Sequence, residues 1–123
     1  MLTEKDYCDY ETCVALRELG YNAPQRLLVD YFGVYDEPQY DEKIHLYDAQ
    51  KWLREEKKII IEATFNLMYK GQPRFSWGVL YNLTQHKGCY YTIDSVKSKE
   101  DYDSFEEALS EGIKEAVKIL KEK

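Results

Sequence analysis

Apolar residues recur along this chain with two different periods, and each period predicts a different kind of element. Spacings of three to four residues favour helices over residues 9–19, 46–57 and 104–120. Alternation with a period of two favours strands over 59–69, 74–84 and 89–94. A run rich in β-branched and aromatic residues favours a further strand over 27–35.

The ends of two helices carry their own signals. Asp9 is placed to cap the first helix with its carboxylate. Ser104 opens the last helix, and Glu107 follows three residues later, which is the pattern of a capping box. Acidic residues come early and lysines late in that helix, as the helix dipole favours. The last helix is therefore the strongest prediction of the sequence.

Short turns at 70–73 and 85–88 separate the last three strands, which predicts an antiparallel meander. In its first strand, the odd-numbered residues from Ile59 to Tyr69 are expected to share the buried face. The second and last helices are expected to cover that face.

The predicted fold is thus α+β, a single domain over residues 1–123. It has an antiparallel sheet of three to four strands, a β-meander, with helices packed mainly on one face. The element order is α-β-α-β-β-β-α, and whether residues 27–35 join the sheet stays open.

Composition narrows the function. The 123 residues carry 17 basic and 23 acidic side chains, a net charge of −6, which disfavours a generic nucleic-acid binder. Aromatic residues make up 15% of the chain, too many for a disordered protein. No apolar run is long enough to span a membrane, and the first residues show no apolar signal segment. With three cysteines in no framework spacing, the expected location is cytoplasmic.

The residues that could carry chemistry form no recognisable motif. The soft metal donors are Cys8, Cys13, Cys89, His45 and His86. They lack zinc-site spacing, so we expect no metal, and no cofactor motif is present. Cys89 with His86 is a conceivable dyad across a turn. Mid-strand Glu62 is expected to be solvated, or to pair with Arg74 across the hairpin. We therefore predict that the protein is not an enzyme and has no catalytic residues.

Twelve tyrosines are more than one small core can absorb. Tyrosine is enriched at protein interfaces because it combines a rigid apolar ring with a polar tip. The candidate protein-contact surface comprises Tyr31, Tyr35, Tyr40, Tyr47 and Tyr90. The partner is an unknown protein or a second copy in a homodimer, and partly exposed structural tyrosines are the alternative interpretation.

Two partial resemblances concern the second half of the chain. Its order of helix, meander and helix resembles the double-stranded RNA-binding domain. That family has lysines at the start of the last helix, where this chain has Glu106 and Glu107, so RNA binding is not implied. Gly88-Cys89 and Ser104-Phe105-Glu106-Glu107-Ala108-Leu109 also resemble the HicB antitoxin family, although Tyr81-Asn82-Leu83-Thr84 replaces its Pro-Asp-Leu-Pro segment.

A fuller resemblance spans nearly the whole chain. The matching segments are Tyr10-Glu11-Thr12, Ala15-Leu16-Arg17-Glu18-Leu19-Gly20-Tyr21, Ala49-Gln50-Lys51-Trp52-Leu53-Arg54-Glu55, Glu107-Ala108-Leu109 and Gly112-Ile113. They resemble small uncharacterised proteins of Bacteroides-type gut bacteria and their phages or mobile elements. His45 stands where those proteins have a Thr or Ser cap on the second helix. The resemblance implies a fold and a context but no activity.

Three hypotheses follow. The first is a non-enzymatic accessory or binding protein, related to phages or mobile elements, that acts through protein–protein contacts. The second is a HicB-like antitoxin module that masks a basic partner with its acidic surface. The third is an enzyme of unrecognised type, which a pocket containing Glu62, a histidine or Cys89 would favour.

Overall fold

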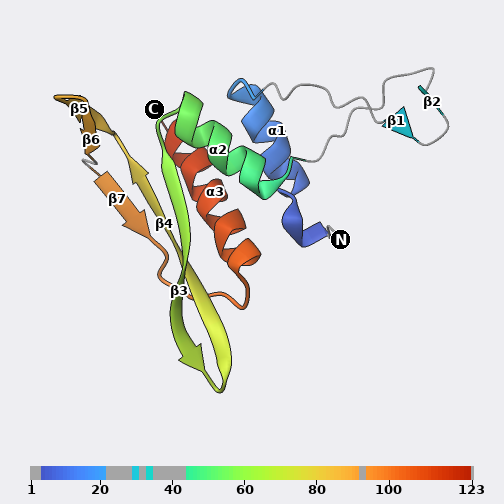
Figure 1. Ribbon diagram of the computed structural model, residues 1–123, viewed down its shortest axis with the longest axis vertical. Helices are drawn as coiled ribbons and strands as arrows, with labels where there is room; N and C mark the ends of the chain where they lie inside the picture. The colour runs from blue at the N-terminus through green and yellow to red at the C-terminus, as the bar shows by residue number, and fades with distance from the viewer. Residues whose placement is uncertain (1–3, 22–28, 31–32, 35–43, 92–93, 123) are drawn as a thin grey trace.

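The computed structural model describes residues 4–21, 29–30, 33–34, 44–91 and 94–122 (Figure 1). The elements are a 3₁₀ turn η1 (Glu4–Asp6), helices α1 (Tyr10–Glu18), α2 (Leu46–Glu56) and α3 (Phe105–Lys121), and strands β1 (Val29–Asp30), β2 (Gly33–Val34), β3 (Ile60–Tyr69), β4 (Gln72–Tyr81), β5 (Thr84–His86), β6 (Cys89–Tyr91) and β7 (Asp94–Lys97). The predicted α+β class and all three predicted helices are confirmed.

Each helix begins at a side-chain cap. Asp9 Oδ1 accepts a hydrogen bond from the Thr12 N–H at 2.8 Å, and Ser104 Oγ accepts one from the Glu107 N–H at 3.1 Å, as predicted. His45 caps α2 with its imidazole, whose Nδ1 accepts from the Tyr47 N–H at 3.2 Å. A ring nitrogen therefore takes the place of the usual hydroxyl.

The main sheet has three antiparallel strands in the order β3-β4-β7. The third strand was predicted at 89–94, and this prediction is wrong, because β7 begins only at Asp94 and pairs with β4 through Tyr81. The chain turns away after Tyr81 at Asn82, whose φ is 54°, and Asn82 Nδ2 donates to Asp94 Oδ2 at 2.7 Å. Between these residues β5 and β6 form a separate hairpin.

The prediction of one strand over 27–35 is also wrong for the part that the structure describes. Val29 pairs with Val34 and Asp30 with Gly33, so β1 and β2 run antiparallel to each other. In one continuous strand, Val29 and Val34 would be separated along the strand and could not pair with each other. In the described residues β1 and β2 form their own two-stranded ladder and do not join β3, β4 and β7.

A helical layer covers one face of the sheet. Helix α3 packs across β3 and β4, and α1 and α2 pack against α3 on the same side (Figure 1). The core between the layers includes these fully buried side chains: Leu16, Leu46, Leu53, Ile59, Ile61, Val79, Leu109 and Ile113. The predicted packing of helices mainly on one face is confirmed.

An ion pair joins α1 to α3. Lys114 Nζ lies 3.1 Å from Asp9 Oδ2 and 3.1 Å from Glu111 Oε1. Partial burial works against both charges, but the hydrogen bonds outweigh it. Those from Thr12 and Lys114 hold the pKa of Asp9 below its usual value, and those from Asp9 and Glu111 raise the pKa of Lys114.

The alternation along β3 breaks at a bulge. The pairing with β4 shifts between Phe65 and Leu67, so Phe65 faces Phe75 but Leu67 faces Arg74. Leu67 and Tyr69 consequently lie on the face opposite Phe65, and the prediction that all odd residues from Ile59 to Tyr69 share one face is wrong. Met68, which lies opposite Pro73, is instead on the face of the sheet that the helices cover.

Helix α3 approaches the sheet closely at Gly112. A Cβ atom on this residue would lie 2.8 Å from Ile61 Cγ2 and 3.2 Å from Trp77 Cβ. Both neighbouring atoms are close to their own backbones and have little freedom to move. The absence of a side chain at residue 112 thus sets the distance between the two layers.

We expect Gly112→Ala to lower the free energy of unfolding by about 1–2 kcal/mol in urea denaturation, because the cost of overpacking exceeds the gain in helix propensity of up to about 1 kcal/mol. Ser110→Ala on the same helix is the control and should be neutral or slightly stabilising. Equal stability of Gly112→Ala and Ser110→Ala would contradict the close approach.

Candidate protein-contact surface

The structure describes two of the five tyrosines that were predicted to form the contact surface. Tyr31, Tyr35 and Tyr40 lie outside the described residues. Tyr90 is placed by its backbone on β6, opposite Gln85. Tyr47, at the start of α2, is 46% exposed, so its predicted exposure is confirmed.

Tyr47 belongs to a row of rings that the sequence did not reveal. In order, the aromatic row consists of His45, Tyr47, Phe105, Phe75 and Phe65. The successive ring centroids lie 5.2, 6.3, 6.3 and 6.5 Å apart, within the range of favourable aromatic pairs. Tyr7 touches the first ring, with centroids 5.6 Å apart. The row therefore connects the starts of α2 and α3 to the β3–β4 hairpin.

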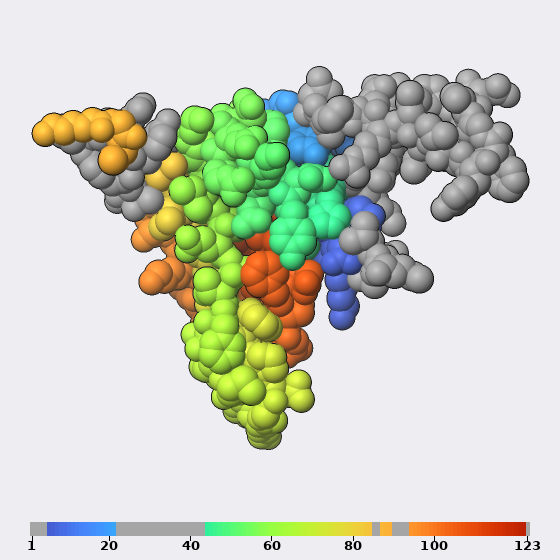
Figure 2. All heavy atoms as spheres, in the orientation of Figure 1, coloured from blue at the N-terminus to red at the C-terminus, as the bar shows by residue number. Residues whose placement is uncertain are grey.

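These elements meet on one face of the molecule. Figure 2 shows the start of α2, the start of α3 and the β3–β4 hairpin side by side on the face turned to the viewer. Tyr47 is 46% and Phe65 is 56% exposed, whereas Phe105 and Phe75 between them are half-buried. The row is thus anchored in the half-buried region at its centre and reaches the open surface at Phe65.

The end of the β3–β4 hairpin extends beyond the N-terminal end of α3 (Figure 1). We call residues 64–73 the hairpin tip, and all of them are exposed. The large apolar side chains at the hairpin tip are Phe65, Leu67, Met68 and Tyr69. Because of the bulge they occupy both faces of the hairpin. Such a concentration of exposed apolar side chains marks a contact surface more often than an ordinary solvated one.

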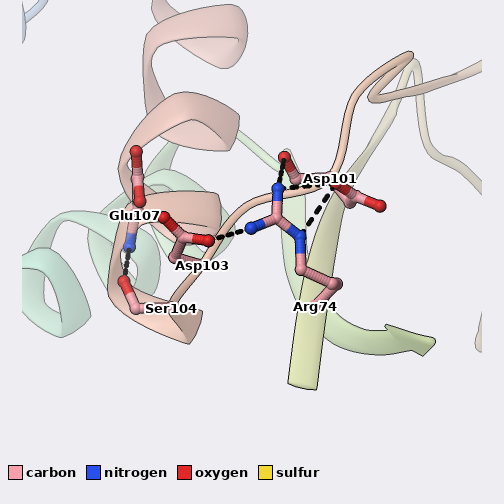
Figure 3. A network of polar contacts seen from close by, with 5 residues as sticks. All are labelled: Arg74, Asp101, Asp103, Ser104 and Glu107. Carbon is pink, nitrogen blue, oxygen red and sulfur yellow. Dashed lines mark hydrogen bonds and ion pairs between the residues drawn. The ribbon is translucent and has the colours of Figure 1, made fainter. Parts of the chain in front are cut away.

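An arginine ties the hairpin to the start of α3 (Figure 3). Arg74 donates from Nε and Nη2 to Asp101 Oδ1 at 3.0 and 2.7 Å, and Nη2 also donates to the Asp101 carbonyl oxygen at 3.1 Å. Nη1 contacts Asp103. Of the two alternatives for Glu62, pairing with Arg74 is wrong, because the register places Glu62 opposite Gly78, four residues further along β4. Its exposure confirms the other alternative, a solvated side chain.

This contact orients the aromatic row. Tyr102 lies between the two aspartates and exchanges two backbone hydrogen bonds with Phe75, at 2.9 and 2.7 Å. Ser104 then caps α3, and Phe105 follows directly against the Phe75 ring. The link from Arg74 to Asp101 therefore fixes where α3 begins relative to the hairpin.

The cysteines lie in two different environments. Cys8 and Cys13 are buried in the core, and Cys89 is exposed. Cys13 Sγ donates to the Cys8 carbonyl oxygen at 3.6 Å, and the neighbouring Cys13 thiol together with burial raises the pKa of Cys8. A buried thiol with a raised pKa, such as that of Cys8, packs as a small apolar side chain and reacts slowly.

The remaining candidate chemical groups lie at different places in the fold, except for His86 and Cys89. In the described ranges, no three His, Cys, Asp or Glu side chains form a group that could hold a metal ion. His86 lies opposite Cys89 in the β5–β6 register, Glu62 is exposed on β3, and His45 serves as the cap of α2. The described helices also include none that is long and apolar enough to cross a bilayer.

Comparison of the chain with models of known protein families, with curated proteins and with solved structures gives no match.

We expect Asp101→Ala to lower the free energy of unfolding by about 1–2 kcal/mol, because it removes charge-assisted hydrogen bonds from a partly buried arginine. Asp103→Ala is the matched control. Its carboxylate is 83% exposed, so its loss should cost no more than about 0.5 kcal/mol. Chemical denaturation of both variants measures the difference, and equal costs would show that Asp101 does not anchor α3.

Proposed function

We propose that this chain is a non-enzymatic accessory protein that acts through protein–protein contacts, with the hairpin tip and the aromatic row as its contact surface. One observation carries the proposal. Phe65, Leu67, Met68 and Tyr69 are exposed together at the hairpin tip, and Phe65 continues into the aromatic row. Exposed aromatic and methionine side chains are typical of the centre of a protein interface.

Several features support the context of this function. The resemblance to proteins of Bacteroides-type gut bacteria favours a role connected with phages or mobile elements. Unpaired cysteines favour the cytoplasm. The acidic start of α3, with Glu106 and Glu107, argues against binding of duplex RNA at this end of the helix.

Acidic side chains beside the aromatic row favour a second candidate function, an antitoxin-like module that masks a basic partner. Asp48 follows Tyr47 and is exposed, as are Asp103 and Glu107 near Phe105. A contact made mainly through these carboxylates would weaken steeply with added salt. A contact made through the hairpin tip would change little with salt.

Affinity capture from the native host, followed by reconstitution of the purified pair, tests the proposal. We expect Phe65→Lys to weaken binding at least tenfold, because a charge would be buried in an apolar contact. Tyr10→Lys is the matched control, since Tyr10 is 74% exposed on α1 and the change in charge is the same.

Isothermal titration between 50 and 500 mM salt then separates the two candidates. Binding that resists salt and is lost only in Phe65→Lys supports the hairpin tip. Equal losses in both variants would refute this surface, and a steep salt dependence with intact binding by Phe65→Lys would favour the antitoxin-like module.

A further inference from the structure

The outer edge of β3 is the sheet edge closest to the hairpin tip. Among the described residues no strand pairs with it, since β3 ends the order β3-β4-β7. Gln50 of α2 covers its first part, where Nε2 donates to the Ile61 carbonyl oxygen at 2.7 Å. Beyond Ala63, every residue of β3 is exposed.

The backbone groups of this edge point away from β4. Phe75 uses both its N–H and its carbonyl oxygen to bind Tyr102, so it cannot exchange hydrogen bonds with Phe65 opposite it. Trp77 likewise uses its N–H and its carbonyl oxygen to bind Ser98. Ala63, which lies opposite Trp77, is therefore in a non-hydrogen-bonded pair with it. Ala63 and Phe65 therefore present their N–H and C=O groups at the outer edge.

The side chains of the same segment carry a simple charge pattern. Residues 63–69 contain no charged side chain, and the run is bounded by Glu62 before it and Lys70 after it. When two copies of this segment lie antiparallel, the acidic end of each adjoins the basic end of the other. A parallel arrangement would bring like charges together, which destabilises strand pairing.

The shape of the molecule permits the antiparallel arrangement. The hairpin tip extends past α3, so an inverted second copy can lie along residues 64–69 with its own helical layer at the opposite end (Figure 1). The apolar side chains on both faces of each tip would then be adjacent to those of the other copy. An edge strand that is long, apolar and unpaired is a ready template for such pairing.

From these observations we infer that the hairpin tip binds a second copy of this chain, by antiparallel pairing of the two β3 edges in a two-fold dimer. This inference rests on the proposed function, because it names the partner of the same contact surface. The interface is isologous, so each Glu62–Lys70 contact occurs twice.

Exchanging the charges of Glu62 and Lys70 tests this inference. Sedimentation velocity of the whole protein over a range of concentrations measures the strength of the dimer. Glu62→Lys and Lys70→Glu alone should each weaken the dimer by roughly tenfold, since each disturbs two equivalent contacts. The double variant Glu62→Lys/Lys70→Glu should restore the dimer to near its original strength. Phe65→Lys should abolish the dimer, Tyr10→Lys should leave it intact, and far-UV circular dichroism should show that all variants are folded.

The other outcomes separate this inference from the proposed function. A protein that is monomeric at all concentrations, or single and double charge variants that weaken the dimer alike, would overturn antiparallel self-pairing. If such a monomer still binds a reconstituted partner in a way that Phe65→Lys removes, the proposed function stands and the second copy is not the occupant. A monomer that binds no partner would overturn both.

Discussion

The close approach of α3 to the β3–β4 hairpin at Gly112 is the contact on which the other features of this fold depend. It lets Ile61 and Trp77 pack directly against the helix backbone, so the two layers share one tightly packed core. The helix begins at Phe105, where Ser104 caps it and the contact of Arg74 with Asp101 holds the preceding segment. With that start fixed, α3 covers the first part of the hairpin and leaves the hairpin tip outside.

The exposed hairpin tip is therefore a consequence of how the core is built. Ile61 on β3 is buried, whereas Phe65, four residues further along the same strand, is more than half exposed. The aromatic row joins these two regions, since its rings remain in contact from the half-buried Phe105 to Phe65. A partner bound at the hairpin tip would thus adjoin a row of rings that leads back to the core.

The sequence predicted what local chemistry determines, and it failed where long-range pairing decides. Asp9 and Ser104 predicted the starts of their helices correctly, because a capping side chain acts on a backbone N–H only three residues away. The third sheet strand was misplaced because the sequences of β5 and β6 are typical of strands in general. Only their pairing with each other shows that the chain leaves the main sheet at Asn82. Counting tyrosines predicted an exposed Tyr47, which the structure shows, but it gave no indication of the exposed hairpin tip. The signal there was the uncharged run 63–69, in which Met68 adds an apolar residue at an even position that one buried face does not require.

Amide hydrogen exchange, followed by NMR as a function of protein concentration, tests most directly that the hairpin tip pairs with a second copy of this chain. The N–H of Phe65 points outward from the sheet edge, and the N–H of Tyr10 at the first position of α1 serves as an exposed reference. The account predicts that exchange at Phe65 slows as concentration rises, while exchange at Tyr10 stays constant. Exchange at Phe65 that remains as fast as at Tyr10 at every concentration would contradict it.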